Sequence, residues 1–381
     1  MPRPPRCAPS VAQMSGAVFS PIAARLQSGV DVVPLHVGDT WLEPFPGGRM
    51  EDLRQADYPG LHRYTETVGL PELVDAIVEK VRTRNEIACE RDAVLVTGGA
   101  TGGLAAAVGM LAAPGEEILI LAPFWPLIRG IVQTFRATAV EVPFHDRIDS
   151  ADAAVEAVSA RTNERSVALY VSTPSNPTGR VIPTAWLEAL AEFARREGLW
   201  LISDEVYEDY VYRGEHVSIA RFAPERTLTV FSFSKAYGMA GYRTGYLVGP
   251  AEAVARAERI STHTVYSAPT SGQVAGLRAL RDGGDWLAHA RERYRAVGES
   301  TAQTLGLPSP EGSTFLFVDV SSKLDDRGIW GFLEDCVEAG VALAPGPSCG
   351  EAYSGWVRLC YTSAPPDAVA GAARRLAALL S

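Results

Sequence analysis

The sequence predicts an α/β protein in which a mostly parallel sheet lies between helices, followed by a smaller α+β unit. The first observation is a series of short apolar runs that alternate with segments of helical period. The second is a change of pattern near residue 285, where a long arginine-rich helix begins. The third is composition, because 381 residues with 47% hydrophobic and 21% charged side chains can bury a substantial core. Such sheets bind ligands beyond the carboxyl ends of their strands.

The predicted strands of the large unit are apolar runs, and amphipathic segments between them predict helices. The last of these helical segments ends on Gly198, a residue that commonly stops a helix. We expect strands at residues 93–97, 117–122, 166–172, 199–203, 227–233 and 245–249, and helices at 72–84, 104–111 and 184–198.

The smaller unit is predicted from an alternation of helices and strands in the last hundred residues. We therefore predict a large domain at residues 46–280 and a small domain that combines residues 1–45 with 281–381. Within the small domain we expect a helix at 285–305, a strand at 314–320, a helix at 328–340, a strand at 356–362 and a closing helix.

Composition and charge exclude several classes of function. The net charge of −10 argues against a nucleic-acid partner, and no apolar stretch approaches the ~20 residues needed to span a membrane. The five cysteines are scattered and odd in number, and the histidines are isolated, which favours reduced thiols in a cytoplasm over disulfides or a metal site. We read the proline-rich N-terminus as a loose arm.

Lys235 is unusual for its residue type and its place. The chain has three lysines, Lys80, Lys235 and Lys323, against thirty-two arginines. Arginine cannot release its proton near neutral pH, whereas a partly desolvated lysine amine can act as a base and as a nucleophile. Its position in FSFSKAYGMAGYRTG, between hydroxyl residues and a glycine-rich run, therefore predicts a functional amine.

Other polar residues follow the predicted strands and should gather at the same edge of the sheet. GGATGG follows 93–97 as a glycine-rich turn that leads into a helix, and the free N–H groups at the start of that helix can hold a phosphate. The run fits neither the dinucleotide nor the P-loop spacing, and an ordinary turn is the alternative. Ser232, Ser234 and Arg243 would add hydroxyl donors and a fork-shaped cation for the same phosphate.

Asp204 ends an apolar strand, where a carboxylate needs a cationic partner. That partner is either an arginine or the protonated ring nitrogen of a bound heterocycle. Asn176 and Tyr207 can hydrogen-bond a ring hydroxyl, and Trp125 can stack on the ring or belong to the core. Together with Lys235 and the candidate phosphate-binding residues, these side chains match the functional groups of pyridoxal phosphate.

The chain resembles the class I/II aminotransferases, which have the aspartate-aminotransferase fold (fold type I of the pyridoxal-phosphate-dependent transferases). The resemblance covers the chain from about Val32 to the C-terminus. It is carried by SFSK with Arg243 eight residues later, and by STPSNPTG, SDEVYEDYVY, PGLHRYTETVGLPEL, VTGGATGGL and GWVRLCYT, in the family's order.

The resemblance implies a role for each matching residue. Lys235 would form the imine and shuttle a proton, Asp204 would hold the pyridinium nitrogen, and Arg358 would bind the substrate carboxylate. For Arg358 a strand-end salt bridge is the alternative. Asn176 and Tyr207 would contact the ring oxygen, Trp125 would stack, and Gly38 and Asn176 would lie beside the substrate. The phosphate would be held by Gly99, Ala100, Thr101, Ser232, Ser234 and Arg243.

Tyr64 matches a tyrosine that reaches the phosphate of the neighbouring subunit, which implies a homodimer with shared active sites; a helix-capping role is the alternative. In the loop after Gly38 the family often has a proline, which is absent from Gly38-Asp39-Thr40-Trp41. With Glu43, Asp39 places two acids near the variable end of the pocket. This motivates the hypothesis of a cationic amino acid substrate.

The resemblance implies an aminotransferase that moves an amino group between an L-amino acid and a 2-oxo acid. The alternative is a pyridoxal-phosphate-dependent lyase, decarboxylase or cyclase, because one fold hosts several reactions. A third interpretation, a transcription regulator that only binds the cofactor, would need a DNA-binding domain. The ~30 residues before the matching region are too few for one.

Overall fold

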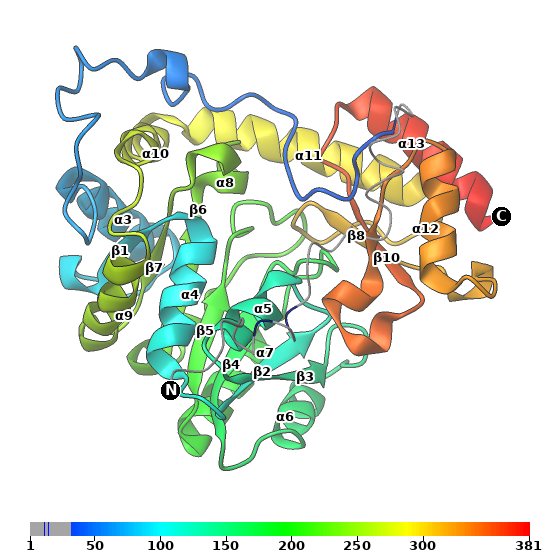
Figure 1. Cartoon of the computed structure of the whole chain (residues 1–381), viewed down its shortest axis with the longest axis horizontal. Coiled ribbons are helices and arrows are strands. Elements are labelled where there is room, and N and C mark those ends of the chain that lie inside the picture. Colours follow the sequence, from blue (N-terminus) through cyan, green and yellow to red (C-terminus); the bar gives the residue numbers. More distant parts are fainter. Residues whose placement is uncertain (1–10, 12–13, 15–31) are drawn as a thin grey trace, which may run out of the picture.

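The computed structural model describes residues 32–381 together with Val11 and Met14. Figure 1 shows a large unit built on a seven-stranded sheet and a smaller unit, at the right of the view, built on a three-stranded sheet. The described part of the chain contains no helix long and apolar enough to cross a membrane.

The large sheet is mostly parallel, as predicted. Strand β7 is the exception, because it runs antiparallel to both of its neighbours, β1 and β6. Strand β3 was not predicted: it pairs only with β2 at the sheet edge, is largely half-buried, and lacks a continuous apolar run. In spatial order the strands are β1 (Val94–Thr97), β7 (Gly245–Val248), β6 (Thr227–Ser232), β5 (Trp200–Asp204), β4 (Ser166–Ser172), β2 (Glu117–Ala122) and β3 (Thr138–Pro143).

Helices cover both faces of this sheet, as alternate residues of β2 show. Ile118 and Ile120 pack in the apolar cluster that contains α4, α5 and α9, whereas Leu119 and Leu121 pack in the cluster that contains α6 and α7. The helices of the large unit are α3 (Pro71–Arg84), α4 (Gly99–Leu111), α5 (Leu127–Thr134), α6 (Ala151–Ser159), α7 (Thr184–Glu197), α8 (Phe233–Ala236), α9 (Ala251–Thr264) and α10 (Thr270–Asp282).

Two helix ends bear on the predictions. Helix α7 ends before Gly198, which has a left-handed φ of 74°, as its sequence indicates. Helix α4 begins at Gly99, earlier than the predicted residue 104, so GGATGG supplies its first turn rather than a loop before it.

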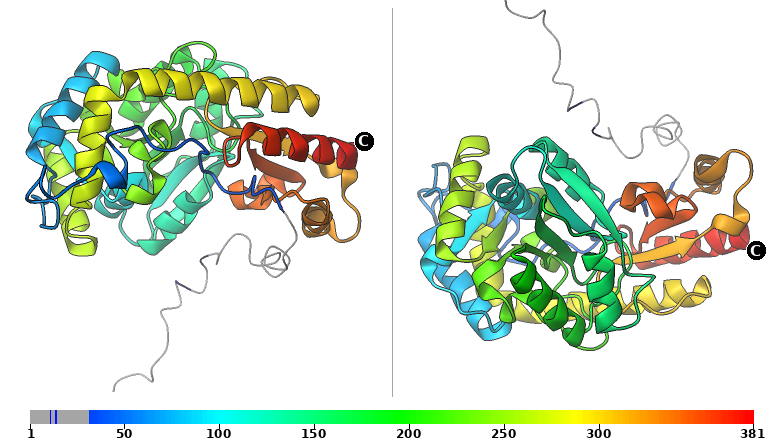
Figure 2. Two further views of the ribbon diagram at one scale, coloured as in Figure 1. Left: turned by 90° about the horizontal axis from the view of Figure 1, so that it is seen from above. Right: turned by 90° about the horizontal axis from the view of Figure 1, so that it is seen from below.

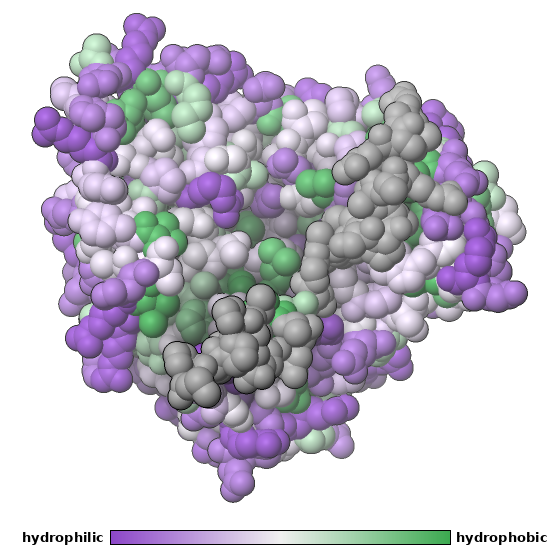
Figure 3. Space-filling view, viewed as in Figure 1, coloured by the Kyte–Doolittle hydropathy of each residue, from purple (hydrophilic) through white to green (hydrophobic). Residues whose placement is uncertain are grey.

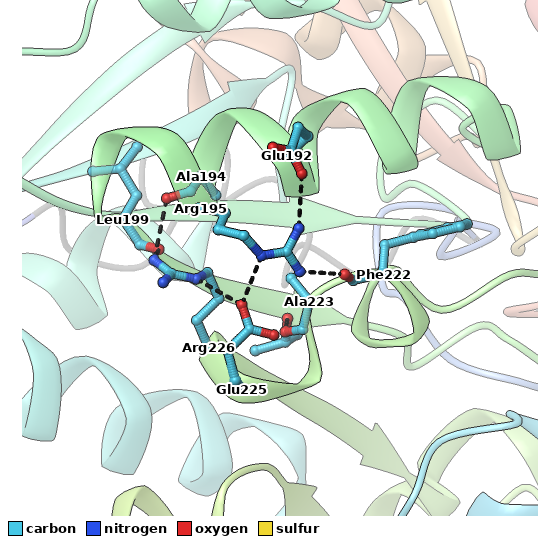
Figure 4. Close-up of polar contacts among 9 residues, drawn as sticks. Glu192, Ala194, Arg195, Leu199, Phe222, Ala223, Glu225 and Arg226 are labelled. Atoms are coloured by element: carbon cyan, nitrogen blue, oxygen red, sulfur yellow. Dashed lines mark hydrogen bonds and ion pairs between the residues drawn. The ribbon is translucent and has the colours of Figure 1, made fainter.

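The C-terminal end of α7 is fastened to the segment that leads into β6 (Figure 4). This segment contains two short 3₁₀ helices, η4 (Ile219–Arg221) and η5 (Pro224–Arg226). Arg226 donates to the carbonyls of Ala194 and Leu199, each at 3.2 Å, and so satisfies helix-end acceptors. Arg195 of α7 donates in return to the Phe222 carbonyl at 2.6 Å. These bonds fix the start of β6, and the far end of that strand leads directly into α8, which carries Lys235.

The smaller unit has an antiparallel sheet in the order β8-β10-β9, covered by helices. Figure 2 shows α11 extending from the large unit along one side of the molecule toward α13. Leu35 is buried in this unit's core, and Val33 pairs with Val341, while the domain boundaries at residues 45 and 280 stay predictions. The elements are α11 (Gly284–Thr304), β8 (Phe315–Asp319), α12 (Gly328–Glu338), β9 (Ala344–Pro345), β10 (Trp356–Cys360) and α13 (Pro366–Leu380).

Candidate active site

A cavity of about 200 Å³ lies at the carboxyl edge of the large sheet, where the smaller unit meets it. The site residues predicted from the sequence line this cavity, with the exceptions of Gly99 and Tyr64. The predicted residues in its wall are Gly38, Ala100, Thr101, Trp125, Asn176, Asp204, Tyr207, Ser232, Ser234, Lys235, Arg243 and Arg358, and Leu104, Val206 and Ala240 complete it.

Strand direction brings these residues together. Parallel strands β4, β5 and β6 end at one edge, and Asn176, Asp204 and Lys235 lie at or just past their ends. Because β7 is antiparallel, the same edge holds its beginning. Arg243, two residues before β7, therefore joins the group.

The first turn of α4 forms a cradle with Arg243 and the start of β7. The N-cap Gly98 provides no side-chain bond, so the leading amide groups of α4 remain available for an anion. A Cβ on Gly99 would lie 2.6 Å from Arg243 Nη2, and one on Gly245 would lie 2.8 Å from the Ala100 nitrogen. The close approach of these two segments thus depends on glycine, and the resulting cradle suits a phosphate.

Arg243 has the bonding expected of an anion-binding side chain. Its guanidinium donates to the carbonyls of Ala240 at 2.9 Å and Gly98 at 3.5 Å. Among residues 32–381 no carboxylate forms an ion pair with it. Its positive charge is therefore available to a ligand at the cradle.

Asp204 is a buried carboxylate at the end of β5, only 7% exposed. Its Oδ2 accepts from the Tyr170 hydroxyl at 2.6 Å, and its Oδ1 accepts from the Val206 amide at 3.3 Å. Burial raises the pKa of Asp204 to about 6, against the effect of these two hydrogen bonds. No ion pair with a described arginine or lysine forms, so the arginine alternative is not what this structure shows. A cationic ligand atom would supply the missing charge.

Lys235 lies in the short helix α8, with its amine in the cavity wall. Its Nζ donates to the Gly38 carbonyl. Burial lowers the pKa of Lys235, and the nearby Asp39 charge opposes that effect only in part. A lysine with a lowered pKa can act as a base or a nucleophile at moderate pH.

Arg358, on β10, is a buried cation with spare donors, 6% exposed. Its Nη1 donates to Asn176 Oδ1 at 3.1 Å and its Nη2 to the His36 carbonyl at 2.9 Å, while Nε has no hydrogen-bond partner among the described residues. The strand-end salt bridge considered from the sequence is absent among the described residues. The guanidinium is therefore suited to bind a carboxylate.

Two aromatic residues complete the wall. Tyr207 is buried and meets Phe315 edge-on at 5.6 Å between ring centroids. Burial raises the pKa of Tyr207, so its hydroxyl stays neutral and can donate. Trp125, half-buried after β2, offers ring surface to the cavity.

Some predicted residues lie outside the cavity wall. Gly99 sits behind it in the first turn of α4, and Tyr64 is 82% exposed and contacts Tyr266 at 4.8 Å between centroids. Asp39 and Glu43 are exposed and do not line the cavity. The sequence reasoning also missed Tyr170, whose only signal was a hydroxyl-bearing ring in the otherwise apolar centre of SVALYVS.

The chain matches the family "Aminotransferase class I and II" over residues 30–376. It is 34% identical over 348 residues to the aspartate/prephenate aminotransferase of Thermus thermophilus, with 88% of each chain covered. It is 32% identical over 345 residues to the arginine–pyruvate transaminase of Pseudomonas aeruginosa, covering 88% of this chain and 87% of the relative.

A solved structure gives the same result for the fold. The aspartate aminotransferase of Thermus thermophilus with maleate superimposes with a TM-score of 0.89 and 32% identity, covering 98% of this chain and 100% of that one. The expected fold type I is confirmed. No relative named here is a lyase or cyclase, and nothing favours that alternative. The chain belongs to the class I and II aminotransferases.

Proposed function

We propose that this aminotransferase binds pyridoxal phosphate in the cavity around Lys235 and exchanges the amino group of an L-amino acid with a 2-oxo acid. Aminotransferases of this family depend on that cofactor. One observation carries the proposal for this chain: a single cavity is lined by a lysine amine, a buried carboxylate and a buried arginine, and residues 32–381 provide no ion-pair partner for the carboxylate or the arginine.

When bound, pyridoxal phosphate supplies an aldehyde that takes up the amino group and a ring that accepts the electrons of the bond broken at the substrate α-carbon. Lys235 would hold the aldehyde carbon covalently, and the α4 cradle with Arg243 would hold the phosphate. Asn176 and Tyr207 would donate to the ring oxygen, and Trp125 would lie against the ring.

Asp204 would hold a proton on the ring nitrogen. An isolated buried carboxylate has a raised proton affinity, which a cation beside it lowers again. The same pairing raises the proton affinity of the nitrogen, and each pKa unit favours its protonated form by ~1.4 kcal/mol. Asp204 would therefore keep the ring nitrogen protonated, which lets the ring accept those electrons.

Arg358 and Lys235 would act on the substrate itself. The spare donors of Arg358 bind the α-carboxylate, which orients the α-carbon. Once the substrate amino group has displaced it from the aldehyde carbon, the freed amine of Lys235, whose pKa is lowered by burial, would take the proton from the α-carbon and later return one. Both actions use groups that are already in the cavity wall.

We also propose a homodimer in which Tyr64 reaches the phosphate site of the partner. Tyr64 and Tyr266 are 82% and 46% exposed, and Val265, beside Gly98 of the cradle, is 52% exposed. Large apolar side chains at that exposure favour an interface. Figure 3 shows one face of the molecule, on which hydrophilic residues form most of the rim and hydrophobic residues are exposed in patches nearer the middle. The free cysteines at 89, 336, 349 and 360 support a reducing, cytoplasmic location.

Reductive labelling tests the proposal directly, because the chain has three lysines. Purified protein is incubated with pyridoxal phosphate, reduced with borohydride and digested, and the peptides are analysed by mass spectrometry. We expect the label on Lys235, its absence in Lys235→Arg, and no change in Lys323→Arg, a surface control. Label on Lys80 or Lys323 alone would refute the assignment.

A second readout separates amino transfer from elimination. Given an amino acid alone, a transaminase converts its bound cofactor to the amine form and releases one equivalent of 2-oxo acid. A lyase regenerates the starting cofactor and releases product continuously. Continuous ammonia release without conversion of the cofactor would establish the alternative reaction.

A further inference from the structure

We propose that Tyr170 is a positioning residue for Asp204: its hydroxyl fixes carboxylate oxygen Oδ2, so that Oδ1, which accepts only the longer bond from the Val206 amide, can also accept from the ring nitrogen of the cofactor. This inference rests on the proposed function, because it concerns the pairing of Asp204 with a pyridinium ring. Tyr170 does not line the cavity and would act only through Asp204.

The strand register places the two side chains on one face of the sheet. Strands β4 and β5 pair in parallel, with Ser172 opposite Asp204 and Tyr170 opposite Ile202. Residues two apart on a strand share a face, so Tyr170 lies on the face of Asp204, one pair further from the edge. The length of the tyrosine side chain then carries its hydroxyl to Asp204 Oδ2, at 2.6 Å. That distance is typical of a hydrogen bond to a charged oxygen.

The phenol has no packing reason to be a tyrosine. Tyr170 is fully buried in the apolar cluster with Ile202 and Ile120, where phenylalanine would fill the same space without a polar atom to satisfy. Burying a hydroxyl costs free energy unless it is hydrogen-bonded. The hydrogen bond to Asp204 offsets the free energy of burying the Tyr170 hydroxyl, and it also orients the carboxylate.

The charge state of Asp204 makes this bond consequential. Burial raises the pKa of Asp204 to about 6, and the Tyr170 hydroxyl is the largest effect that opposes the rise. Without that donor a larger fraction of Asp204 would be protonated near neutral pH, and a neutral acid cannot pair with a pyridinium ion. The other ionisable groups around Asp204 are its neighbour Glu205, Tyr207 in the following turn, and Lys235, Arg243 and Arg358 in the cavity wall.

The test compares Tyr170→Phe with Tyr361→Phe in the full-length chain. Tyr361 is also fully buried, and its hydroxyl donates to the Ser313 carbonyl at 2.8 Å, away from Asp204. Pyridoxal phosphate affinity is measured by titration between pH 5.5 and 8.5. We expect Tyr170→Phe to bind about tenfold more weakly at pH 7 and to lose affinity at a higher pH on acidification, with Tyr361→Phe unchanged. Wild-type affinity and pH dependence in Tyr170→Phe would overturn the proposal.

A double-mutant cycle separates positioning from packing. In an Asp204→Ala background the Tyr170→Phe change should have no further effect on affinity. An equal loss in both backgrounds would show that Tyr170 acts through packing and would also overturn the proposal. Should Tyr170→Phe fail to fold, Tyr170→His, which keeps a ring donor, is compared with Tyr170→Leu. Tighter binding by the histidine variant is then the expected result, and equal binding contradicts it.

If the wild-type protein takes no borohydride label at Lys235, the proposed function fails. If it is labelled and Tyr170→Phe still binds like the wild type, only the role of Tyr170 fails.

Discussion

At the scale of single residues, the site contains two buried charges, Asp204 and Arg358, for which the described part of the chain supplies no oppositely charged partner. Arg358 has two of its three guanidinium nitrogens on neutral oxygens and the third unpaired, and its side chain lies over the Phe315 ring, with its carbon 4.6 Å from the ring centroid. Desolvating a cation without an anion is costly. A substrate carboxylate would pair with Arg358 and remove that cost. Much of the binding energy of the substrate can therefore come from its carboxylate.

Replacing Arg358 by lysine should therefore damage substrate binding although the charge is kept. Lysine is a point charge that cannot form a bidentate pair, so we expect kcat/KM for an α-amino acid to fall about 100-fold, mainly through KM. Steady-state kinetics measure this, with Arg374→Lys, an exposed arginine on α13, as the control. An unchanged KM in Arg358→Lys would remove its assignment to the carboxylate.

Glu205, next to Asp204, belongs to a separate buried group. It is fully buried and accepts from the hydroxyls of Ser203 at 2.7 Å and Ser218 at 2.6 Å, with His216 Nε2 at 2.8 Å. The potential ligand atoms of Glu205, Glu208 and His216 lie within 4.8 Å of one another. Glu208 is paired with Lys80, so the negative charges of this group are already balanced without a metal ion.

The Glu205–His216 pair predicts a pH dependence of stability. Burial alone would lower the pKa of His216, but the Glu205 charge and hydrogen bond raise it overall; for Glu205, burial would raise the pKa, but His216 and the serines lower it. Because the pKa of His216 is higher in the folded than in the unfolded protein, its contribution to stability is fully present below the unfolded pKa of about 6.5. That contribution is lost as the pH rises through the folded pKa. Because the pKa of Glu205 is lower in the folded protein, its contribution to stability is fully present above the unfolded pKa of about 4.3. That contribution is lost as the pH falls through the folded pKa.

We therefore expect the wild type to have a larger free energy of unfolding than His216→Gln. This difference should be greatest between about pH 4.3 and 6.5 and should become smaller at higher pH. Urea unfolding at a series of pH values measures it. His263→Gln, at an exposed histidine on α9, should show no such trend. A constant gap from pH 5 to 8 would mean that His216 is not charged in the folded protein.

At the scale of elements, the first turn of α4 and the start of β7 build the phosphate cradle together. Gly99 combines a left-handed φ of 71° with contact to Arg243, whereas Gly198 at the end of α7 has a φ of 74° with open space around it. A substitution at either glycine strains the backbone, but only a substitution at Gly99 also creates a steric contact with Arg243.

Gly99→Ala and Gly198→Ala should each cost ~1 kcal/mol of stability, because alanine disfavours that backbone conformation. Only Gly99→Ala should weaken pyridoxal phosphate binding, by about tenfold, because its methyl group displaces Arg243. Thermal unfolding and cofactor titration give the two numbers. Equal affinities in both variants would place the phosphate elsewhere.

At the scale of the whole molecule, the exposed Tyr64 has no role that a single chain explains. It contacts Tyr266, itself exposed, next to the cradle loop. In a symmetric dimer each copy would give its Tyr64 to the other copy's site.

Mixing two inactive variants tests this arrangement. Tyr64→Ala lacks the donated residue and Lys235→Ala lacks the amine, but a mixed dimer contains one site with both. After equal amounts are unfolded and refolded together, we expect about a quarter of wild-type activity, from statistical pairing of symmetric partners. No recovery, with dimers confirmed by sedimentation, would place Tyr64 outside the shared site.

Much of this site could be predicted because its chemistry requires particular residue types at strand ends. Lys235 stood out as a lysine in an arginine-rich chain, and Asp204 as an acid after an apolar run. Tyr170 could not be predicted, because tyrosine is an ordinary residue of buried strands and its bond to Asp204 depends on the pairing of β4 with β5. Strand β3 was missed because an edge strand lacks the apolar run used as the signal.

The sequence by itself determined which functional groups the protein has and in what order, as well as the alternation of strands and helices that makes a parallel sheet. The tertiary structure decided which groups meet. The reversal of β7 brings Arg243 to the α4 cradle, and the folding of β10 against the large unit brings Arg358 to Asn176. The physical reason is that side-chain direction follows from strand register and strand direction, which are set by packing between segments far apart in the chain.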